Sequence, residues 1–229
     1  MLQIKRQNDL MHLLREQKEL TVKELCALLY SSPATIRRDL RELEEKGLLK
    51  RSFGGAVLVE DYSNQLPRDL RYSTNIQSKK NLCARAAQLV CDGDTIFIDA
   101  SSTTYFLAPY LKKHKELTVI TNNPSLSLLL SQMKIHNLST GGEMLNDSFA
   151  LVGRDAERFV SRIHAHKCFF SARGYADFIS DSSRPERDIK EEMLAHADRA
   201  IFLADASKNG NVYPYPVTDL ASVEKILEG

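Results

Sequence analysis

The stretch "SSPATIRRDL", residues 31–40, combines the start of a helix with a pair of arginines. Ser32 is a typical N-cap residue, and Pro33 suits the first helical position, where its missing N–H removes no hydrogen bond. At about 100° per residue, Ile36 and Leu40 fall on one apolar stripe. The stretch therefore predicts a helix that begins at a defined residue and buries one face.

The other face of this helix carries the residues expected to read DNA. Ala34 is small, and Arg37, Arg38 and Arg41 project away from the apolar stripe. A small residue lets the helix N-terminus approach base edges, whereas arginine pairs with guanine or with phosphate. The alternative is a surface helix whose charges are merely solvated, and the preceding sequence disfavours it.

Two further helices are predicted ahead of this one. The first covers residues 5–15, and the second follows Thr21, whose hydroxyl forms a capping box with Glu24. Tyr30 and Ser31 make the short turn before the third helix. Three helices in this order are typical of a helix-turn-helix domain.

The run "LLKRSFGGAVLV", residues 48–59, follows Gly47, the expected end of the third helix. Two short β-like runs meet at Gly54-Gly55, which predicts a hairpin and hence the wing of a winged helix. Lys50 and Arg51 lie on its first run, where they are placed to contact phosphates.

Charge and composition restrict the function classes of the 229-residue chain. Its net charge is +1, and residues 1–60 hold 11 Lys and Arg against 9 Asp and Glu, a net of +2. DNA affinity must then depend on the placement of basic residues and on dimerisation rather than on a high net positive charge.

No apolar run approaches the roughly 18 residues of a membrane span. Four isolated cysteines without a CxxC pair favour reduced thiols in the cytoplasm over disulfides or a zinc site. We expect no bound metal and no cofactor.

The pattern of apolar residues changes along the chain, which predicts two domains. We expect a winged helix-turn-helix DNA-binding domain over residues 1–58 and a polar, aperiodic linker over residues 59–76. Residues 77–229 alternate short apolar runs with helical stretches, which predicts a larger α/β domain. We expect this domain to sense an effector and to oligomerise.

Residues 5–57 resemble the N-terminal domain of the DeoR family of bacterial transcription repressors. The resemblance rests on "S-x-x-T-I-R-R-D-L", from Ser32 to Leu40, and on the "R-x-F-G-G-A" that follows. It implies sequence-specific binding to double-stranded operator DNA by Ser32, Thr35, Arg37 and Arg38.

Four predicted strands of the second domain end in polar residues. They lie in "DGDTIFID", "LTVITNN", "KCFFSARG" and "RAIFLADASK". In an open parallel sheet, ligands bind outside the carboxyl ends of the strands. The residues expected at this edge are Asp99, Ser101, Ser102, Thr103, Thr104, Asn122, Arg173 and Lys208.

The hydroxyl-rich loop at residues 101–104 is expected to precede a helix. Free backbone N–H groups, the helix dipole and the hydroxyls would together favour a phosphate. The alternative is that Ser102 or Thr103 simply caps the helix.

The second domain resembles the DeoR-family sensor, which is similar in fold to ribose-5-phosphate isomerase and CoA transferases. The matching stretches are "GDTIFIDASSTT", "VITNN", "TGGEM", "LVGRDAERFV" and "ERDIKEEMLAHADRAIFLADASK". The resemblance implies a phosphorylated sugar or related metabolite as effector. It adds four residues to the effector site: Gly142, Gly153, Glu186 and Lys190.

The sequence departs from the family pattern in two places. "RGYADFISDSSRPERD" replaces the usual Gly-Ile and Gly-Leu-Thr-like turn, so we expect the floor of the pocket to differ. The family also continues beyond a segment like Asp219-Leu220 through another strand and helix, whereas this chain ends at Gly229. The expectation is therefore either a naturally short protein or a sheet without its terminal strand, which would expose an edge.

The preferred interpretation is a repressor of a sugar-metabolism operon that a phosphosugar releases. We expect a homo-oligomer, a dimer or a tetramer, and no enzymatic activity. One alternative is an isomerase-like enzyme, with Asp99, Glu186 and Asp205 as candidate bases. The other is a DNA-binding protein whose second domain only dimerises it.

Overall fold

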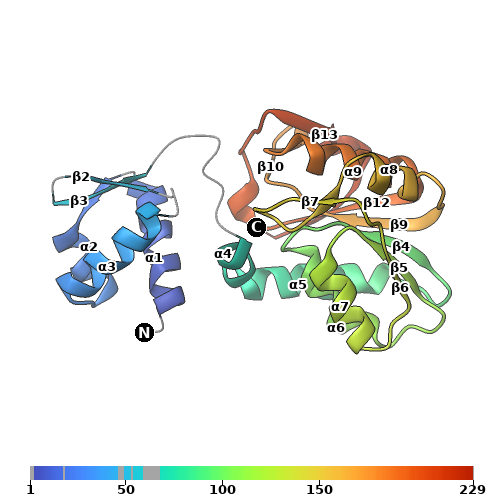
Figure 1. Ribbon diagram of the computed structural model, residues 1–229, viewed down its shortest axis with the longest axis horizontal. Helices are drawn as coiled ribbons and strands as arrows, with labels where there is room; N and C mark the ends of the chain where they lie inside the picture. The colour runs from blue at the N-terminus through green and yellow to red at the C-terminus, as the bar shows by residue number, and fades with distance from the viewer. Residues whose placement is uncertain (1–2, 18, 46–48, 53, 59–67, 229) are drawn as a thin grey trace. The chain divides into compact units, whose positions relative to one another are not determined.

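The computed structural model describes residues 3–17, 19–45, 49–52, 54–58 and 68–228. These residues belong to two compact units, Met1–Thr74 and Asn75–Gly229 (Figure 1). In the residues that the structure describes, no helix is both long and apolar enough to cross a membrane.

The first unit combines helices with a small antiparallel sheet whose strand order is β1-β3-β2. Its elements are α1 (Gln3–Gln17), β1 (Glu19–Thr21), α2 (Val22–Leu29), α3 (Pro33–Glu45), β2 (Leu49–Ser52), β3 (Gly55–Leu58) and α4 (Arg68–Ser73).

Periodic leucines build the core of this unit, as the sequence predicts. Ile36, Leu40 and Leu43 of α3 are fully or almost fully buried, and they pack with Leu10 and Leu14 of α1. The predicted capping box is confirmed, because the Thr21 hydroxyl accepts a hydrogen bond from the backbone of Glu24 and the carboxylate of Glu24 accepts one from the backbone of Thr21. Helix α1 is longer than expected by two residues at each end.

The expected linker, residues 59–76, lies partly outside the described residues, and so does Gly47. The described part of the linker forms α4, where the Ser73 hydroxyl accepts a hydrogen bond of 3.2 Å from the amide of Asn8. Ile76 then begins α5 of the second unit.

A six-stranded parallel sheet with the order β14-β12-β9-β4-β5-β6 forms the centre of the second unit (Figure 1). The four strands predicted from sequence are its four central strands. The strands are β4 (Thr95–Ile98), β5 (Thr118–Thr121), β6 (Asn137–Ser139), β9 (Ala165–Phe170), β12 (Ala197–Ala204) and β14 (Glu224–Leu227).

Helices cover both faces of this sheet because successive strand residues point to opposite sides. Ile96 and Ile98 pack under one layer, whereas Phe97 packs under the other. The first layer holds α5 (Ile76–Ala86), η1 (Ala87–Leu89), η2 (Thr104–Leu107), α6 (Ala108–Leu111) and α7 (Pro124–Gln132). The second holds α8 (Arg154–Val160) and α9 (Arg184–Ala195).

Short antiparallel strands and two turns of 3-10 helix complete the unit. They are β7 (Glu143–Met144), β8 (Leu151–Val152), β10 (Gly174–Tyr175), β11 (Phe178–Asp181), η3 (Ala206–Lys208), β13 (Tyr215–Asp219) and η4 (Leu220–Ser222). A strand does follow the Asp219-Leu220 segment, since β14 pairs with β12 at one edge of the main sheet.

Candidate nucleic-acid interface and effector site

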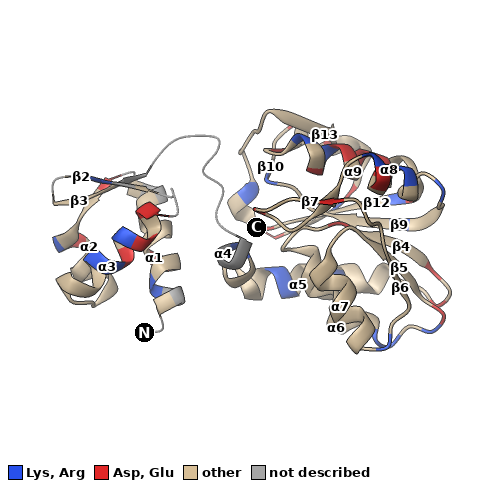
Figure 2. Cartoon of the chain, in the orientation of Figure 1, with Lys and Arg blue, Asp and Glu red and all other residues tan. Residues whose placement is uncertain are grey.

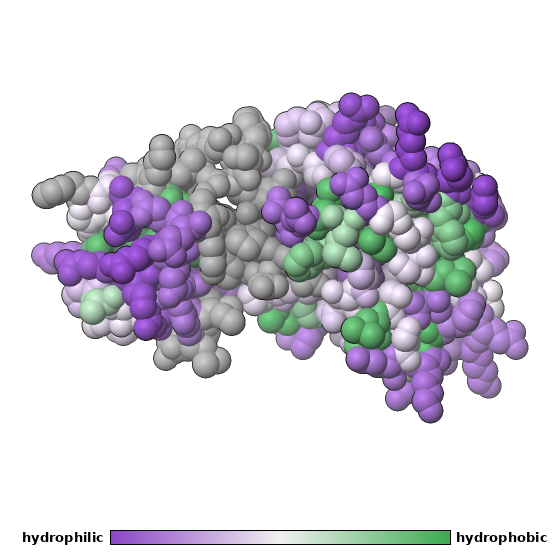
Figure 3. Space-filling view, in the orientation of Figure 1, coloured by the Kyte–Doolittle hydropathy of each residue, from purple (hydrophilic) through white to green (hydrophobic). Residues whose placement is uncertain are grey.

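Helix α3 presents its arginines to solvent. Arg37, Arg38 and Arg41 are exposed, as are Ser32 and Ala34, and Thr35 is half-buried. The Ser32 hydroxyl accepts a hydrogen bond of 3.3 Å from the backbone N–H of Thr35, so Ser32 caps the helix as expected. Hydrophilic side chains dominate the visible face of this unit (Figure 3).

A buried ion pair that the sequence interpretation missed fixes α3 against α1. Arg6 donates through Nε and Nη2 to the two carboxylate oxygens of Asp39, the second at 3.1 Å. Asp39 is fully buried, and the ion pair raises the pKa of Arg6 despite the cost of burial. Asp39 lies three residues after Ile36 and four before Leu43, so an acid inside the apolar stripe was the available signal.

Glutamates near the end of α3 have partners within the same unit. Glu42 accepts hydrogen bonds from the side-chain amides of Gln3 at 2.6 Å and Gln7 at 2.7 Å. Arg38 Nε lies 3.9 Å from Glu42, which is too long for a hydrogen bond. Figure 2 shows basic and acidic segments next to each other on α3. The acids thus have partners of their own, and the arginines keep their exposed donors.

The predicted hairpin is present, with β2 and β3 antiparallel. Gly54 has a φ of 93°, and a Cβ on Gly55 would meet the carbonyl oxygen of Leu20 at 2.3 Å, so both positions require glycine. Arg51 does not extend freely toward solvent, because its Nε donates to Glu44 at 2.5 Å. The side chain of Lys50 lies outside the described part of the structure.

In the second unit, strand register brings the predicted residues to one edge. Ile98 pairs with Thr121 of β5 and with Phe169 of β9. The next residues, Asp99 and Asn122, therefore stand side by side at the carboxyl edge of the sheet. The structure thus brings Asp99, the 101–104 loop, Asn122 and Lys208 to the same edge, as expected from an open parallel sheet.

Asp99 is the centre of a buried hydrogen-bond network. Its Oδ1 accepts hydrogen bonds from the hydroxyls of Ser101 at 2.7 Å and Thr104 at 2.8 Å. Its Oδ2 accepts from the backbone of Ser171 at 3.4 Å and lies 3.6 Å from Lys190 Nζ. Burial raises the pKa of Asp99, although Lys190 and the two hydroxyls favour the carboxylate.

The hydroxyl-rich loop differs from the expectation in one respect. It leads into a four-residue 3-10 helix and then into the four-residue α6, and Thr103 makes no side-chain cap hydrogen bond. So short a helix has little dipole at its N-terminus, since the macrodipole sums over aligned peptide units. The regular helix expected directly after this loop is therefore wrong, and so is the alternative that Thr103 caps it, whereas phosphate binding by the loop stays a prediction.

Two lysines bind the loop hydroxyls instead. Lys79 of α5 donates to Ser102 at 3.2 Å, and Lys208 donates to Thr103 at 3.2 Å and to Ser171 at 2.6 Å. Desolvation lowers the pKa of Lys208 to about 8, in spite of the nearby Asp205. Sequence reasoning missed Lys79, which lies on the same helical stripe as the buried Leu82.

A second charged group lies beside Asp99. Lys190 of α9 donates to Asp181 at 2.6 Å, and Arg173 Nε lies 3.8 Å from the same carboxylate. Burial disfavours the Lys190 ammonium, but the charges of Asp181, Asp99 and Glu186 outweigh it and raise the pKa of Lys190. One network thus contains the predicted residues Asp99, Ser101, Thr104, Arg173 and Lys190.

The β8 segment lies beside three further predicted residues, Asn122, Gly142 and Gly153. The Asn122 amide donates to the Leu151 carbonyl at 3.0 Å, whereas its buried Oδ1 has no hydrogen-bond partner among the described residues. A Cβ on Gly142, whose φ is 102°, would meet the Val152 carbonyl oxygen at 2.5 Å. Gly153 precedes α8 with a φ of 87° and open space around its Cα.

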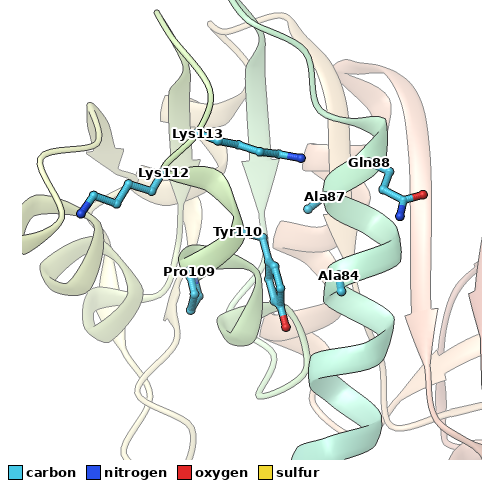
Figure 4. A pocket seen from close by; sticks show the side chains of 7 residues that line it. All are labelled: Ala84, Ala87, Gln88, Pro109, Tyr110, Lys112 and Lys113. Atoms are coloured by element: carbon cyan, nitrogen blue, oxygen red, sulfur yellow. The ribbon is translucent and has the colours of Figure 1, made fainter.

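A separate hollow lies between α5 and α6 (Figure 4). The side chains of Lys112 and Lys113 point in different directions there, so they do not converge on one ligand. None of the predicted site residues lines this hollow. Its lining residues are Ala84, Ala87, Gln88, Pro109, Tyr110, Lys112 and Lys113.

Comparison with known proteins places both units. Residues 6–61 match the model of the DeoR-like helix-turn-helix domain, and residues 74–228 match that of the DeoR C-terminal sensor domain. The HTH-type transcriptional regulator YulB of Bacillus subtilis is 34% identical over 230 residues, which cover 99% of this chain and 89% of that protein. The lactose phosphotransferase system repressor of Staphylococcus epidermidis is 31% identical and covers 90% of this chain and 83% of that protein.

Among solved structures, a ribose 5-phosphate isomerase of Methanocaldococcus jannaschii matches with a TM-score of 0.45 and 16% identity. The match covers 59% of this chain and 55% of that one. The two family matches cover nearly the whole chain and follow its two units. The chain is therefore a member of the DeoR family, a DNA-binding transcriptional regulator with a helix-turn-helix domain and a C-terminal sensor domain.

Proposed function

We propose that this regulator represses genes of sugar metabolism and leaves its operator when a phosphorylated sugar binds the carboxyl edge of the main sheet. The name of the S. epidermidis relative, a lactose phosphotransferase system repressor, supports the sugar connection. The exposed arginines of α3 support the DNA contact, because their side chains face solvent, and Glu42 lies 3.9 Å from Arg38, too far for a hydrogen bond.

Two elements of the first unit are proposed to bind DNA. Helix α3 enters the major groove, where its first turn approaches base edges and its arginines pair with guanine or phosphate. The hairpin of β2 and β3 lies on the phosphate backbone, and Arg51 exchanges Glu44 for a phosphate. The proposed DNA-binding residues are Ser32, Ala34, Thr35, Arg37, Arg38, Arg41, Lys50 and Arg51.

The proposal of a phosphate effector rests on the environment of Lys208. Its ammonium donates to the hydroxyls of Thr103 and Ser171, and the nearby charge of Asp205 does not outweigh the cost of its burial. Lys190, by contrast, already forms an ion pair with Asp181 at 2.6 Å. A phosphate dianion would give the Lys208 ammonium a negatively charged hydrogen-bond partner. Hydrogen bonds between charged groups are stronger than those between neutral groups.

The neighbouring residues suit the sugar hydroxyls. Asn122 Oδ1 is a buried acceptor that no described residue bonds, and a donor from the ligand would remove a desolvation cost of about 1–3 kcal/mol. Gly153 has open space where a side chain would stand between β8 and α8, whereas Gly142 lets its backbone pass close to the Val152 carbonyl. The proposed effector-binding residues are Asp99, Ser101, Ser102, Thr103, Thr104, Asn122, Gly142, Gly153, Arg173, Glu186, Lys190 and Lys208.

The protein is proposed to act in the cytoplasm as a homo-oligomer that does not turn over its effector. Paired DNA-binding domains would compensate for a net charge of only +2 in residues 1–60, since two half-sites multiply the contacts. The enzyme alternative keeps one argument, which is that a lysine with a pKa of about 8 and a carboxylate with a raised pKa lie in the same network.

One titration panel tests this proposal. The full chain is mixed with hexose and pentose phosphates, with each unphosphorylated parent and with inorganic phosphate. We expect saturable binding of at least one sugar phosphate, without product formation. Turnover would favour the enzyme, and the absence of binding to any member would favour a domain that only dimerises.

A further inference from the structure

Tyr30 is the most exposed large side chain of the described structure that carries an aromatic ring. It retains 95% of its accessible surface, and its hydroxyl makes no hydrogen bond to any described residue. It follows α2 directly, where its backbone N–H donates to the carbonyl of Cys26. The side chain therefore contributes nothing to the packing of the first unit.

The backbone of Tyr30 adopts a conformation that suits glycine. Its φ of 48° and ψ of 46° lie in the left-handed region, where a Cβ crowds the following carbonyl oxygen. Helices commonly end in this conformation, and they usually do so on glycine because it carries no such penalty. An exposed tyrosine at this position has a conformational cost that no side-chain hydrogen bond in the described part of the chain offsets.

The position of Tyr30 explains why a tyrosine is useful there. Two peptide units separate it from Ser32, the cap of α3, so their Cα atoms lie at most about 7.6 Å apart. A polyanion that contacts the first turn of α3 is therefore within reach of the Tyr30 ring. The sequence from Leu25 to Arg38 contains no Asp or Glu, so no acid in this stretch opposes a phosphate.

We propose that the Tyr30 hydroxyl donates a hydrogen bond to a backbone phosphate of DNA bound by α3. Tyrosine hydroxyls are among the groups that position proteins on the phosphate backbone, and such contacts carry no sequence information. The inference rests on the proposed placement of α3 on DNA. Tyr30 then fixes how α3 lies on the duplex, whereas the arginines of α3 read the bases.

The test separates DNA affinity from folding stability in the full chain. The probes are a duplex selected from random-sequence DNA by the wild-type protein and a scrambled duplex of the same composition. Tyr30→Phe removes only the hydroxyl, and we expect it to weaken binding to both duplexes by about tenfold, the same factor for each. Tyr30→Gly should weaken binding at least as much, while its thermal stability stays equal to or above that of the wild type.

Arg38→Ala, measured in parallel, distinguishes failure of this inference from failure of the DNA-binding proposal. If Arg38→Ala weakens the selected duplex and neither Tyr30 variant does, the phosphate contact is rejected and α3 keeps its role. If none of the three variants affects binding, the placement of α3 itself is rejected. If Tyr30→Gly loses DNA affinity and Tyr30→Phe does not, the proposed hydrogen bond is overturned. It is also overturned if the Tyr30 variants change only the self-association of the protein and not its DNA affinity.

Discussion

The surface of α3 and the carboxyl edge of the main sheet handle charge in opposite ways. On α3 the acids Asp39 and Glu42 have partners within the unit, and the arginines remain exposed. At the carboxyl edge, cations and carboxylates lie in one buried network around Asp99 and Lys190. The first arrangement suits a large polyanion that binds from outside, whereas the second suits a small ligand that brings both charge and hydroxyls.

The strongest contrast is expected for the buried Lys190. Lys190→Met leaves the carboxylates of Asp99 and Asp181 buried without their ammonium partner, which should cost about 3–5 kcal/mol of folding free energy. Denaturant unfolding of the full chain measures the loss. The matched control is Arg199→Ala, which breaks the exposed pair with Glu224 and should cost no more than about 1 kcal/mol. If Lys190→Met and Arg199→Ala lose the same folding free energy, the ion pairs at the carboxyl edge are no more buried than the exposed pair.

Lys208 lies at the same carboxyl edge, and its loss should affect ligand binding without affecting DNA binding. Lys208→Ala should weaken binding of the tightest sugar phosphate in the panel by about 1.5–3 kcal/mol, because one charge-assisted hydrogen bond is lost. Operator binding should not change, since Lys208 belongs to the sensor unit. Calorimetric titration and a DNA-binding isotherm give the two values, and an unchanged ligand affinity would remove Lys208 from the site.

The same residue predicts a pH dependence. Burial lowers the pKa of Lys208 to about 8, so the ammonium is present below pH 8 and is lost as the pH rises through that value. Affinity for the sugar phosphate should therefore decline above about pH 8. Lys208→Arg keeps its charge over this range, and it should bind with little dependence on pH between 7 and 9. A decline of the same size in both proteins would assign the effect to another group.

On α3, loss of one exposed arginine should affect DNA binding and leave folding unchanged. Arg38→Ala should cost about 1–3 kcal/mol of specific binding free energy, with the largest loss on the selected duplex. Arg162→Ala removes an exposed arginine from the sensor unit and serves as control. If the scrambled duplex loses as much affinity as the selected one, Arg38 contacts phosphate and does not read bases.

The smallest change in free energy is expected for the Thr21 capping box, which is the clearest local pattern in the sequence. Thr21→Ala removes the capping box of α2 and should cost about 1 kcal/mol of folding free energy. Thr21→Ser keeps a hydroxyl and should retain most of that stability. Thermal unfolding of the three proteins compares them, and identical transitions would show that the cap does not contribute.

These expectations also show which parts of the molecule the sequence could predict. The cap at Thr21 and the stripe of Ile36 and Leu40 depend on residues within a few positions of each other, so they were predicted correctly. The strand ends were predictable because an apolar run followed by polar residues is a local pattern. These features all belong to secondary structure, and each of them determines which face of a helix or which end of a strand a side chain occupies.

Partners far apart in sequence could not be predicted in this way. Arg6 and Asp39 are 33 residues apart, and Lys208 and Thr103 are 105 apart, so only the folded chain brings them together. The 3-10 helix after the 101–104 loop has a local cause that the sequence interpretation also missed, because the Thr104 hydroxyl donates to Asp99, five residues earlier, and competes with a regular helical turn.

Calorimetric titration of one sugar phosphate and of its unphosphorylated parent, with and without the selected duplex, tests the account most directly. We predict that the phosphorylated form binds the DNA-free protein at least about tenfold more tightly than the parent sugar does. Bound DNA should then weaken that affinity by the same factor by which the ligand weakens DNA binding, because coupling between two sites is reciprocal. Equal affinity for the two sugars would contradict the phosphate site at Lys208, and tight binding that is indifferent to DNA would contradict the switch.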